Sequence, residues 1–176
     1  MNAAERARPI RLVGFDVDGV LTDGRLYYSA NDAETKAFHV LDGMGLQLLA
    51  AADIEVCVIS ARSSPAAARR LAELGVRRTL LGTATKRPAF ERLQRELGLD
   101  YSQCAYMGDD LPDLAILARV GLAATVSAAF PTVRERCHWV ATRPAGAGAV
   151  REFIEFLLQA QGCLERLTAP YLELEE

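Results

Sequence analysis

The sequence lacks the features of an exported or membrane protein. Its first nine residues contain no apolar core of the length that a signal peptide needs. No apolar run elsewhere approaches the roughly 18 residues of a membrane span. Internal repeats and low-complexity blocks are also missing. We therefore expect a cytoplasmic protein that has no membrane partner.

Closely spaced cysteines and a strong positive charge are missing too. The four cysteines, at positions 57, 104, 137 and 163, show no C-x-x-C spacing, which argues against a metal knuckle or a redox pair. Cys57 and Cys104 lie inside apolar runs, so we expect them to be buried, reduced thiols. The formal net charge is -3 and the basic residues are dispersed, which argues against a nucleic-acid partner.

What the sequence does contain is an alternation of short apolar runs and amphipathic stretches. The 176 residues are enough for one core, so we expect a single domain over residues 1–176. The runs that favour strands are 11–15, 54–59, 78–81, 104–107 and 121–124. The stretches that favour helices are 43–52, 65–74, 88–97, 113–118 and 148–161. This alternation predicts an α/β fold, a Rossmann-like parallel sheet with helices on both faces.

One segment interrupts the alternation. Between residues 23 and 40, two β-prone runs flank a polar turn, which predicts a β-hairpin inserted after the first strand. An isolated hairpin is marginally stable in water, so this one needs a cover. At the other end of the chain, we expect a tail over residues 162–176.

The first candidate site is an acidic pair that directly follows the first predicted strand. Asp16 and Asp18 stand two residues apart in Asp-Val-Asp-Gly, where ligands of open α/β sheets bind. Two buried carboxylates need a compensating cation, although a D-x-D alone is also compatible with a solvated acidic turn. The fourth predicted strand ends in a second acidic cluster, with Asp109, Asp110 and Asp113. The two clusters could converge on Mg²⁺, and Asp113 also suits the first turn of a helix.

A hydroxyl and a cation follow two other strands. Ser60 and Ala61 end the second predicted strand, where a hydroxyl and backbone N–H groups can bind phosphate oxygens or cap a helix. Lys86 opens the next helix, where the helix dipole disfavours a cation. A bound phosphate would account for that position, and a solvated surface lysine is the alternative.

These residues, taken in order, resemble the four motifs of the haloacid dehalogenase-like superfamily. The motifs are D-x-D-G-x-L-T from Asp16, the hydroxyl of Ser60, the amine of Lys86, and G-D-D-x-x-D from Gly108. The resemblance implies that Asp16 is the nucleophile and Asp18 the general acid/base. It also implies phosphoryl contacts from Ser60, Ala61 and Lys86. The implied Mg²⁺ ligands are Asp16, the Asp18 carbonyl and Asp109, supported by Asp110 and Asp113.

The second aspartate and the short insertions narrow the resemblance. Superfamily members that cleave carbon–halogen bonds lack the equivalent of Asp18, so its presence favours a phosphatase. Only 43 residues separate Asp16 from Ser60, which leaves room for the hairpin but not for a cap domain.

Nearly the whole chain resembles the 3-deoxy-D-manno-octulosonate 8-phosphate phosphatases. The shared stretches include V-D-G-V-L-T-D-G from Val17, K-A-F-x-V-x-D-G-x-G from Lys36, and G-A-V-R-E from Gly148. The resemblance implies a homotetramer whose hairpins form a central barrel, and a phosphorylated sugar acid as substrate in lipopolysaccharide precursor synthesis. The implied substrate contacts are His39, Val40, Leu41, Asp42, Gly43, Arg62 and Arg70.

Two positions depart from that family. Leu41 and Ala147 stand where the family usually has arginines, which could grip an anionic sugar acid through paired hydrogen bonds. Arg143 could compensate from nearby. A nine-carbon sugar-acid phosphate or another small phosphomonoester is therefore the alternative substrate. A catalytically silent, tetramerising assembly protein is a third hypothesis, although Asp16, Asp18, Lys86 and Asp109 are all retained.

Overall fold

The structure is a computed structural model that describes residues 1–30 and 34–172. It contains a six-stranded parallel sheet in the order β5-β4-β1-β6-β7-β8. Its strands are β1 (Leu12–Phe15), β4 (Glu55–Ile59), β5 (Arg78–Leu80), β6 (Cys104–Met107), β7 (Leu122–Thr125) and β8 (Trp139–Val140). The main helices are α2 (Val40–Ala51), α3 (Pro65–Glu73), α4 (Lys86–Glu96), α5 (Leu114–Leu117), α6 (Pro131–Arg134) and α7 (Ala149–Ala160). The predicted α/β fold is confirmed.

Strand β1 lies in the middle of the sheet, with β4 on one side and β6 on the other. All four of its residues are buried, as expected for a strand covered on both faces. The register pairs Phe15 with Val58 and with Met107, so the three strands end at nearly the same level. The loops that follow them therefore meet at one edge of the sheet.

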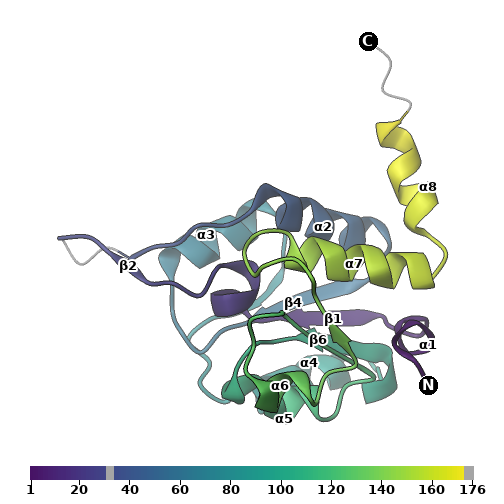
Figure 1. Ribbon diagram of the computed structural model, residues 1–176, viewed down its shortest axis with the longest axis horizontal. Helices are drawn as coiled ribbons and strands as arrows, with labels where there is room; N and C mark the ends of the chain where they lie inside the picture. The colour runs from purple at the N-terminus through teal and green to yellow at the C-terminus, as the bar shows by residue number, and fades with distance from the viewer. Residues whose placement is uncertain (31–33, 173–176) are drawn as a thin grey trace.

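Two helical layers cover the sheet. Helices α2, α3 and α7 lie on one face, and α4, α5 and α6 lie on the other (Figure 1). Phe15 packs edge-on against Phe153 of α7, with 6.4 Å between ring centroids. On the opposite face, Phe90 of α4 packs edge-on against Tyr106, at 5.8 Å. These contacts anchor both layers to the central strands.

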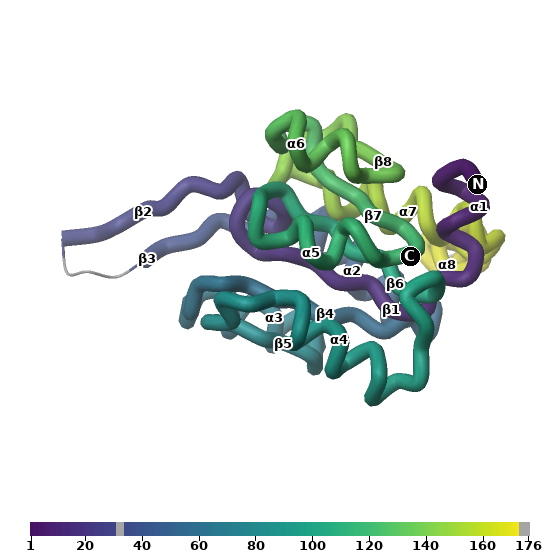
Figure 2. The backbone as a smooth tube through the Cα atoms, turned by 90° about the horizontal axis from the view of Figure 1, so that it is seen from below, coloured from purple at the N-terminus to yellow at the C-terminus, as the bar shows by residue number. Residues whose placement is uncertain are grey.

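The predicted hairpin is present and projects away from the domain (Figure 2). Strand β2 (Tyr27–Tyr28) pairs antiparallel with β3 (Glu34–Thr35). Residues 31–33 of the predicted turn lie outside the described residues. Leu26, Tyr27 and Tyr28 are 42%, 44% and 65% exposed, which leaves an apolar surface on a ribbon that is only two strands wide.

Several element boundaries differ from the sequence-based expectation. Helix α2 begins at Val40, three residues before the predicted start, and α4 begins at Lys86 rather than at residue 88. Helices α1 (Ala3–Ala7) and α6, and strand β8, were not expected, because each is shorter than a reliable periodic pattern.

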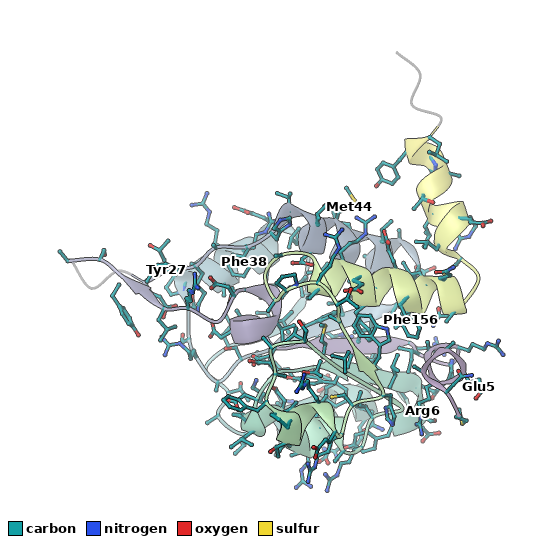
Figure 3. All side chains as sticks on the ribbon, in the orientation of Figure 1. Glu5, Arg6, Tyr27, Phe38, Met44 and Phe156 are labelled. Carbon is teal, nitrogen blue, oxygen red and sulfur yellow. The ribbon has the colours of Figure 1, made fainter. Side chains whose placement is uncertain are left out.

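The predicted C-terminal tail contains a helix. Helix α8 (Leu164–Thr168) is followed by a turn, Ala169–Tyr171, and residues 173–176 lie outside the described residues. The hydroxyl of Tyr171 lies 3.7 Å from the sulfur of Met44. Figure 3 labels Met44 on α2. Within residues 1–30 and 34–172, no helix is long and apolar enough to span a bilayer.

Candidate active site

The two predicted acidic clusters meet at the edge where β1 and β6 end. The backbone N–H of Asp16 donates to the carbonyl of Met107 at 3.0 Å, which joins the two strand ends. Gly19 has a φ of +87°, and a Cβ at this position would lie 2.1 Å from Oδ2 of Asp109. Glycine at this turn thus allows the Asp109 carboxylate to approach the first loop.

Three carboxylates gather there. Oxygens of Asp16, Asp109 and Asp113 lie within 4.8 Å of one another. Burial, reinforced by the neighbouring carboxylates, raises the pKa of Asp16 to about 6 and that of Asp109 to about 7. Oδ1 of Asp109 is buried and accepts no hydrogen bond from residues 1–30 or 34–172. Hard carboxylate oxygens with one unsatisfied acceptor fit a divalent cation such as Mg²⁺.

Asp113 has a supporting position in this cluster, because both of its oxygens are already occupied. Oδ1 accepts from Lys86 at 2.8 Å and from the Tyr106 hydroxyl at 3.0 Å. Oδ2 accepts from the backbone N–H groups of Asp109 and Asp110, at 3.1 and 3.3 Å. Asp113 therefore fixes the loop that carries Asp109. The exposed Asp110 accepts from the N–H of Leu111 and caps the turn.

Lys86 is buried at the first position of α4, so the alternative of a solvated surface lysine is wrong. Its ammonium lies 2.8 Å from Oδ2 of Asp16 and 2.8 Å from Oδ1 of Asp113, and its side chain is 2% exposed. Although burial disfavours the charge, the two carboxylates raise the pKa of Lys86 above its usual value. The structure therefore places a permanent positive charge beside the predicted nucleophile.

Ser60 lies at the end of β4, on the same edge. It is buried, and its hydroxyl oxygen accepts from the N–H of Arg62 at 3.1 Å, across the exposed Ala61. Ser64, and not Ser60, caps α3, through the N–H of Ala67 at 3.3 Å. The hydroxyl of Ser60 is therefore not used as the cap of that helix.

The other predicted substrate contacts lie at the start of α2. His39 caps this helix by accepting from the N–H of Leu41 at 3.2 Å. Val40 and Leu41 are exposed, at 75% and 38%. A Cβ on Gly43 would lie 2.5 Å from Nη2 of Arg70, so these two residues are neighbours.

Asp42 is buried and faces α7. Its oxygens accept from the N–H groups of Gly148 and Arg151, at 3.2 and 2.9 Å. Burial raises the pKa of Asp42, against the effect of these hydrogen bonds. In the described part of the chain, no hydrogen bond or ion pair joins residues 39–43 to Asp16, Asp18 or Lys86.

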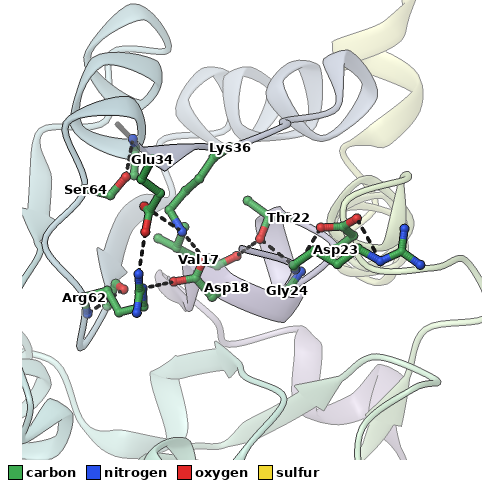
Figure 4. Close-up of polar contacts among 12 residues, drawn as sticks. Val17, Asp18, Thr22, Asp23, Gly24, Glu34, Lys36, Arg62 and Ser64 are labelled. Atoms are coloured by element: carbon green, nitrogen blue, oxygen red, sulfur yellow. Dashed lines mark hydrogen bonds and ion pairs between the residues drawn. The ribbon is translucent and has the colours of Figure 1, made fainter. Parts of the chain in front are cut away.

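The sequence did not indicate three further residues of this edge. Lys36 and Glu34 of the hairpin form an ion-pair network with Asp18 and Arg62 (Figure 4). Tyr106 supports Asp113 from inside β6. The available signal was their spacing of two residues, which places both side chains on one side of an extended segment. Which residues they contact depends on the course of the hairpin.

Comparisons with known proteins agree with this geometry. Residues 80–154 match the model of the haloacid dehalogenase-like hydrolases. The chain is 42% identical to the 3-deoxy-D-manno-octulosonate 8-phosphate phosphatase of Haemophilus influenzae, over 90% of this chain and 88% of that protein. It is 41% identical to the protein of the same name from Escherichia coli K12, over 91% and 85% of the two chains.

Solved structures extend the likeness to three dimensions. The fold matches a probable phosphatase from Pseudomonas syringae with a TM-score of 0.95 and 44% identity, over 98% of both chains. It also matches the phosphatase of Moraxella catarrhalis, solved with magnesium, phosphate and a KDO molecule, with a TM-score of 0.93 and 39% identity over 96% and 97% of the chains. The chain belongs to the haloacid dehalogenase-like hydrolases, in the family of 3-deoxy-D-manno-octulosonate 8-phosphate phosphatases.

Proposed function

We propose that this protein is a Mg²⁺-dependent phosphomonoesterase that hydrolyses 3-deoxy-D-manno-octulosonate 8-phosphate to the sugar acid and phosphate, in lipopolysaccharide precursor synthesis. The main supporting observation is the contact between Asp16 and the buried ammonium of Lys86, beside the unsatisfied oxygen of Asp109. This arrangement combines a nucleophile, a cation for phosphoryl oxygens and a cation-binding carboxylate within one edge of the sheet.

The reaction proceeds through two displacements at phosphorus. A carboxylate oxygen of Asp16 attacks the phosphorus, the bond to the sugar oxygen breaks, and Asp18 gives its proton to that oxygen. Water then attacks the phospho-aspartate and gives a proton to Asp18, and the bond between phosphorus and Asp16 breaks. Lys86 stabilises the negative charge of the phosphoryl oxygens, with Ser60 and the backbone at Ala61 as further contacts.

The residues present fit the implied metal ion. Asp16, the main-chain carbonyl of Asp18 and Asp109 would hold Mg²⁺, and Asp110 and Asp113 would support them. The bound ion would neutralise phosphoryl charge and offset the burial of the two carboxylates.

The substrate assignment rests on the named relatives and on the start of α2. His39, Val40, Leu41, Asp42 and Gly43, together with Arg62 and Arg70, are the proposed sugar contacts. Because Leu41, which is exposed, and Ala147 stand where the family usually has arginines, a nine-carbon sugar-acid phosphate or another small phosphomonoester is the second candidate. Rates of phosphate release from eight- and nine-carbon keto-acid phosphates will separate the two.

We further propose a cytoplasmic homotetramer. The exposed aromatic hairpin supports this assembly, because partner hairpins would cover Leu26, Tyr27 and Tyr28. A neighbouring subunit could also bring the α2 contacts of one chain towards the phosphoryl site of another.

Removing the nucleophile tests the proposed chemistry. Asp16→Asn is expected to abolish phosphate release from the eight-carbon substrate, while circular dichroism and particle mass stay unchanged. Asp53→Asn is the matched control, because Asp53 is exposed with a φ of 57° that asparagine also adopts. Wild-type turnover in Asp16→Asn would exclude the nucleophile assignment, and an inactive wild-type protein would favour the silent assembly protein.

Chelation tests the metal requirement separately. EDTA is expected to abolish the phosphate release of the wild-type protein, and excess Mg²⁺ is expected to restore it. Full activity after thorough chelation would contradict the assignment of Asp16, Asp18 and Asp109 as metal ligands.

A further inference from the structure

Lysine is almost absent from this chain, and both lysines lie at the proposed active site. Of the 20 basic residues, 18 are arginines, and the two lysines are Lys36 and Lys86. Their side chains are 1% and 2% exposed. Lys86 pairs with Asp16, and Lys36 pairs with Asp18. Each aspartate of the D-x-D motif therefore has its own buried ammonium.

The surroundings of Lys36 explain why a compact cation is used there. Its ammonium contacts Oδ1 of Asp18 and lies 3.3 Å from Oε1 of Glu34. Arg62 binds the other oxygen of Glu34, and its Nη2 lies 3.3 Å from the Tyr28 hydroxyl. The Arg62 guanidinium lowers the pKa of Glu34, so this carboxylate stays charged and orients both cations. An ammonium fits this enclosed position better than a planar guanidinium.

The two oxygens of Asp18 have different environments. Oδ1 is held by Lys36, whereas Oδ2 is buried without a hydrogen-bond partner among the described residues, and Nε of Arg62 lies 3.8 Å from it. One oxygen is thus anchored while the other remains available for a proton. This asymmetry suits a group that must give a proton to the leaving oxygen and later take one from water.

We propose that Lys36 is a positioning residue for the reaction, which holds Asp18 in place for both proton transfers. Glu34 acts behind it by fixing the ammonium and the Arg62 guanidinium. The inference rests on the proposed phosphatase function and assigns the hairpin a part in catalysis as well as in assembly. The competing interpretation is that Lys36 only ties the hairpin to the domain.

Two substrates with different leaving groups separate these interpretations. Lys36→Met is expected to lower kcat for the sugar-acid phosphate about 100-fold, with KM within about threefold of wild type, because proton transfer contributes roughly 10²- to 10⁴-fold to rates. With p-nitrophenyl phosphate, the leaving group needs no proton, so the first equivalent of nitrophenol should appear at near wild-type rate. Slow turnover should follow, because the phospho-aspartate awaits a poorly activated water.

Three further variants serve as controls. Lys36→Arg keeps the charge in a bulkier group, so its kcat is expected to lie at least tenfold above that of Lys36→Met and below that of the wild type. Arg25→Met removes a hairpin cation whose side chain is 77% exposed and is expected to keep the wild-type kcat. Glu34→Gln is expected to give a smaller loss of the same kind, and it provides the test if Lys36→Met does not fold.

The outcomes distinguish this proposal from the function on which it rests. A wild-type kcat in Lys36→Met, or equal losses on both substrates without a burst of nitrophenol, would overturn the role of Lys36. A wild-type protein that hydrolyses neither substrate would instead overturn the proposed function.

Discussion

Asp113 organises the acidic cluster without being free to bind a ligand itself. Its two oxygens accept four hydrogen bonds, from Lys86, Tyr106 and the N–H groups of Asp109 and Asp110. Gly108 permits this, since a Cβ there would lie 2.4 Å from the Asp113 carboxyl carbon. A single buried side chain thus links α4, β6 and the loop of Asp109.

We expect replacement of the Asp113 carboxylate to lower the stability of the fold by a large amount. In Asp113→Asn, the NH2 group of the new side chain would face hydrogen-bond donors, and Lys86 would lose a buried negative charge as its partner. We expect a decrease of about 3 kcal/mol in the free energy of unfolding, in the range for breaking a buried ion pair. Urea unfolding measures it. The exposed Asp110→Asn is the control and should change stability by less than about 0.5 kcal/mol; equal effects of the two changes would contradict the role of Asp113.

The lowered pKa of His138 should make the free energy of unfolding depend on pH. Its Nδ1 accepts from the N–H of Ala123 at 2.9 Å, and burial, with a smaller effect from Arg6, lowers the pKa of His138. The folded state therefore favours the neutral ring. The contribution of His138 to the free energy of unfolding is complete above about pH 6.5, the pKa of histidine in the unfolded chain, and is lost as the pH falls below that value. Urea unfolding between pH 5.5 and 8 should show a smaller acid-side loss in His138→Asn. The same loss in both proteins would exclude this group.

At the scale of elements, one carboxylate joins the N-terminal ends of α2 and α7. Gly148 precedes α7 and offers no side chain as a cap, and Asp42 of α2 accepts from the N–H groups of Gly148 and Arg151 instead. A negative charge at a helix N-terminus also interacts favourably with the helix dipole. The helix that carries the proposed sugar contacts is thereby fixed to the helix that covers β1.

Removing this cap should weaken the contact between the two helices. Asp42→Ala leaves one buried and one partly buried N–H group without an acceptor. We expect a loss of about 2 kcal/mol in the free energy of unfolding, measured with urea. Asp42→Asn keeps an acceptor and should lose about half as much. A loss in Asp42→Asn as large as in Asp42→Ala would show that the charge, and not the hydrogen bonds, stabilises α7.

The sequence predicted the sheet and the edge at which its acidic clusters meet, because the carboxyl ends of parallel strands lie at the same edge of a sheet. The proximity of Asp16 and Asp109 could therefore be predicted, because each follows an apolar run. The contact of Asp18 with Lys36 could not be predicted, because it depends on the path by which the hairpin returns to the domain. Strand β8, two residues long, and the five-residue α8 leave too short a pattern to read.

At the scale of the whole molecule, the hairpin determines how copies of the chain can associate. The hairpin projects from the domain (Figure 2), and its residues Leu26, Tyr27 and Tyr28 are exposed. Light scattering of the wild-type protein should give the mass of four chains, and Leu26→Glu should lower it, because four charges would meet at a shared apolar surface. A matched change at the exposed Leu172, Leu172→Glu, should leave the mass unchanged. A wild-type monomer would contradict the tetramer.

The burial of both lysines has a practical consequence for handling the protein. Among the described residues, both lysine ammonium groups are enclosed by carboxylates at the active site. Amine-reactive dyes or surfaces should therefore spare the lysine side chains of the folded enzyme. Reaction at a lysine would report that the catalytic edge has opened.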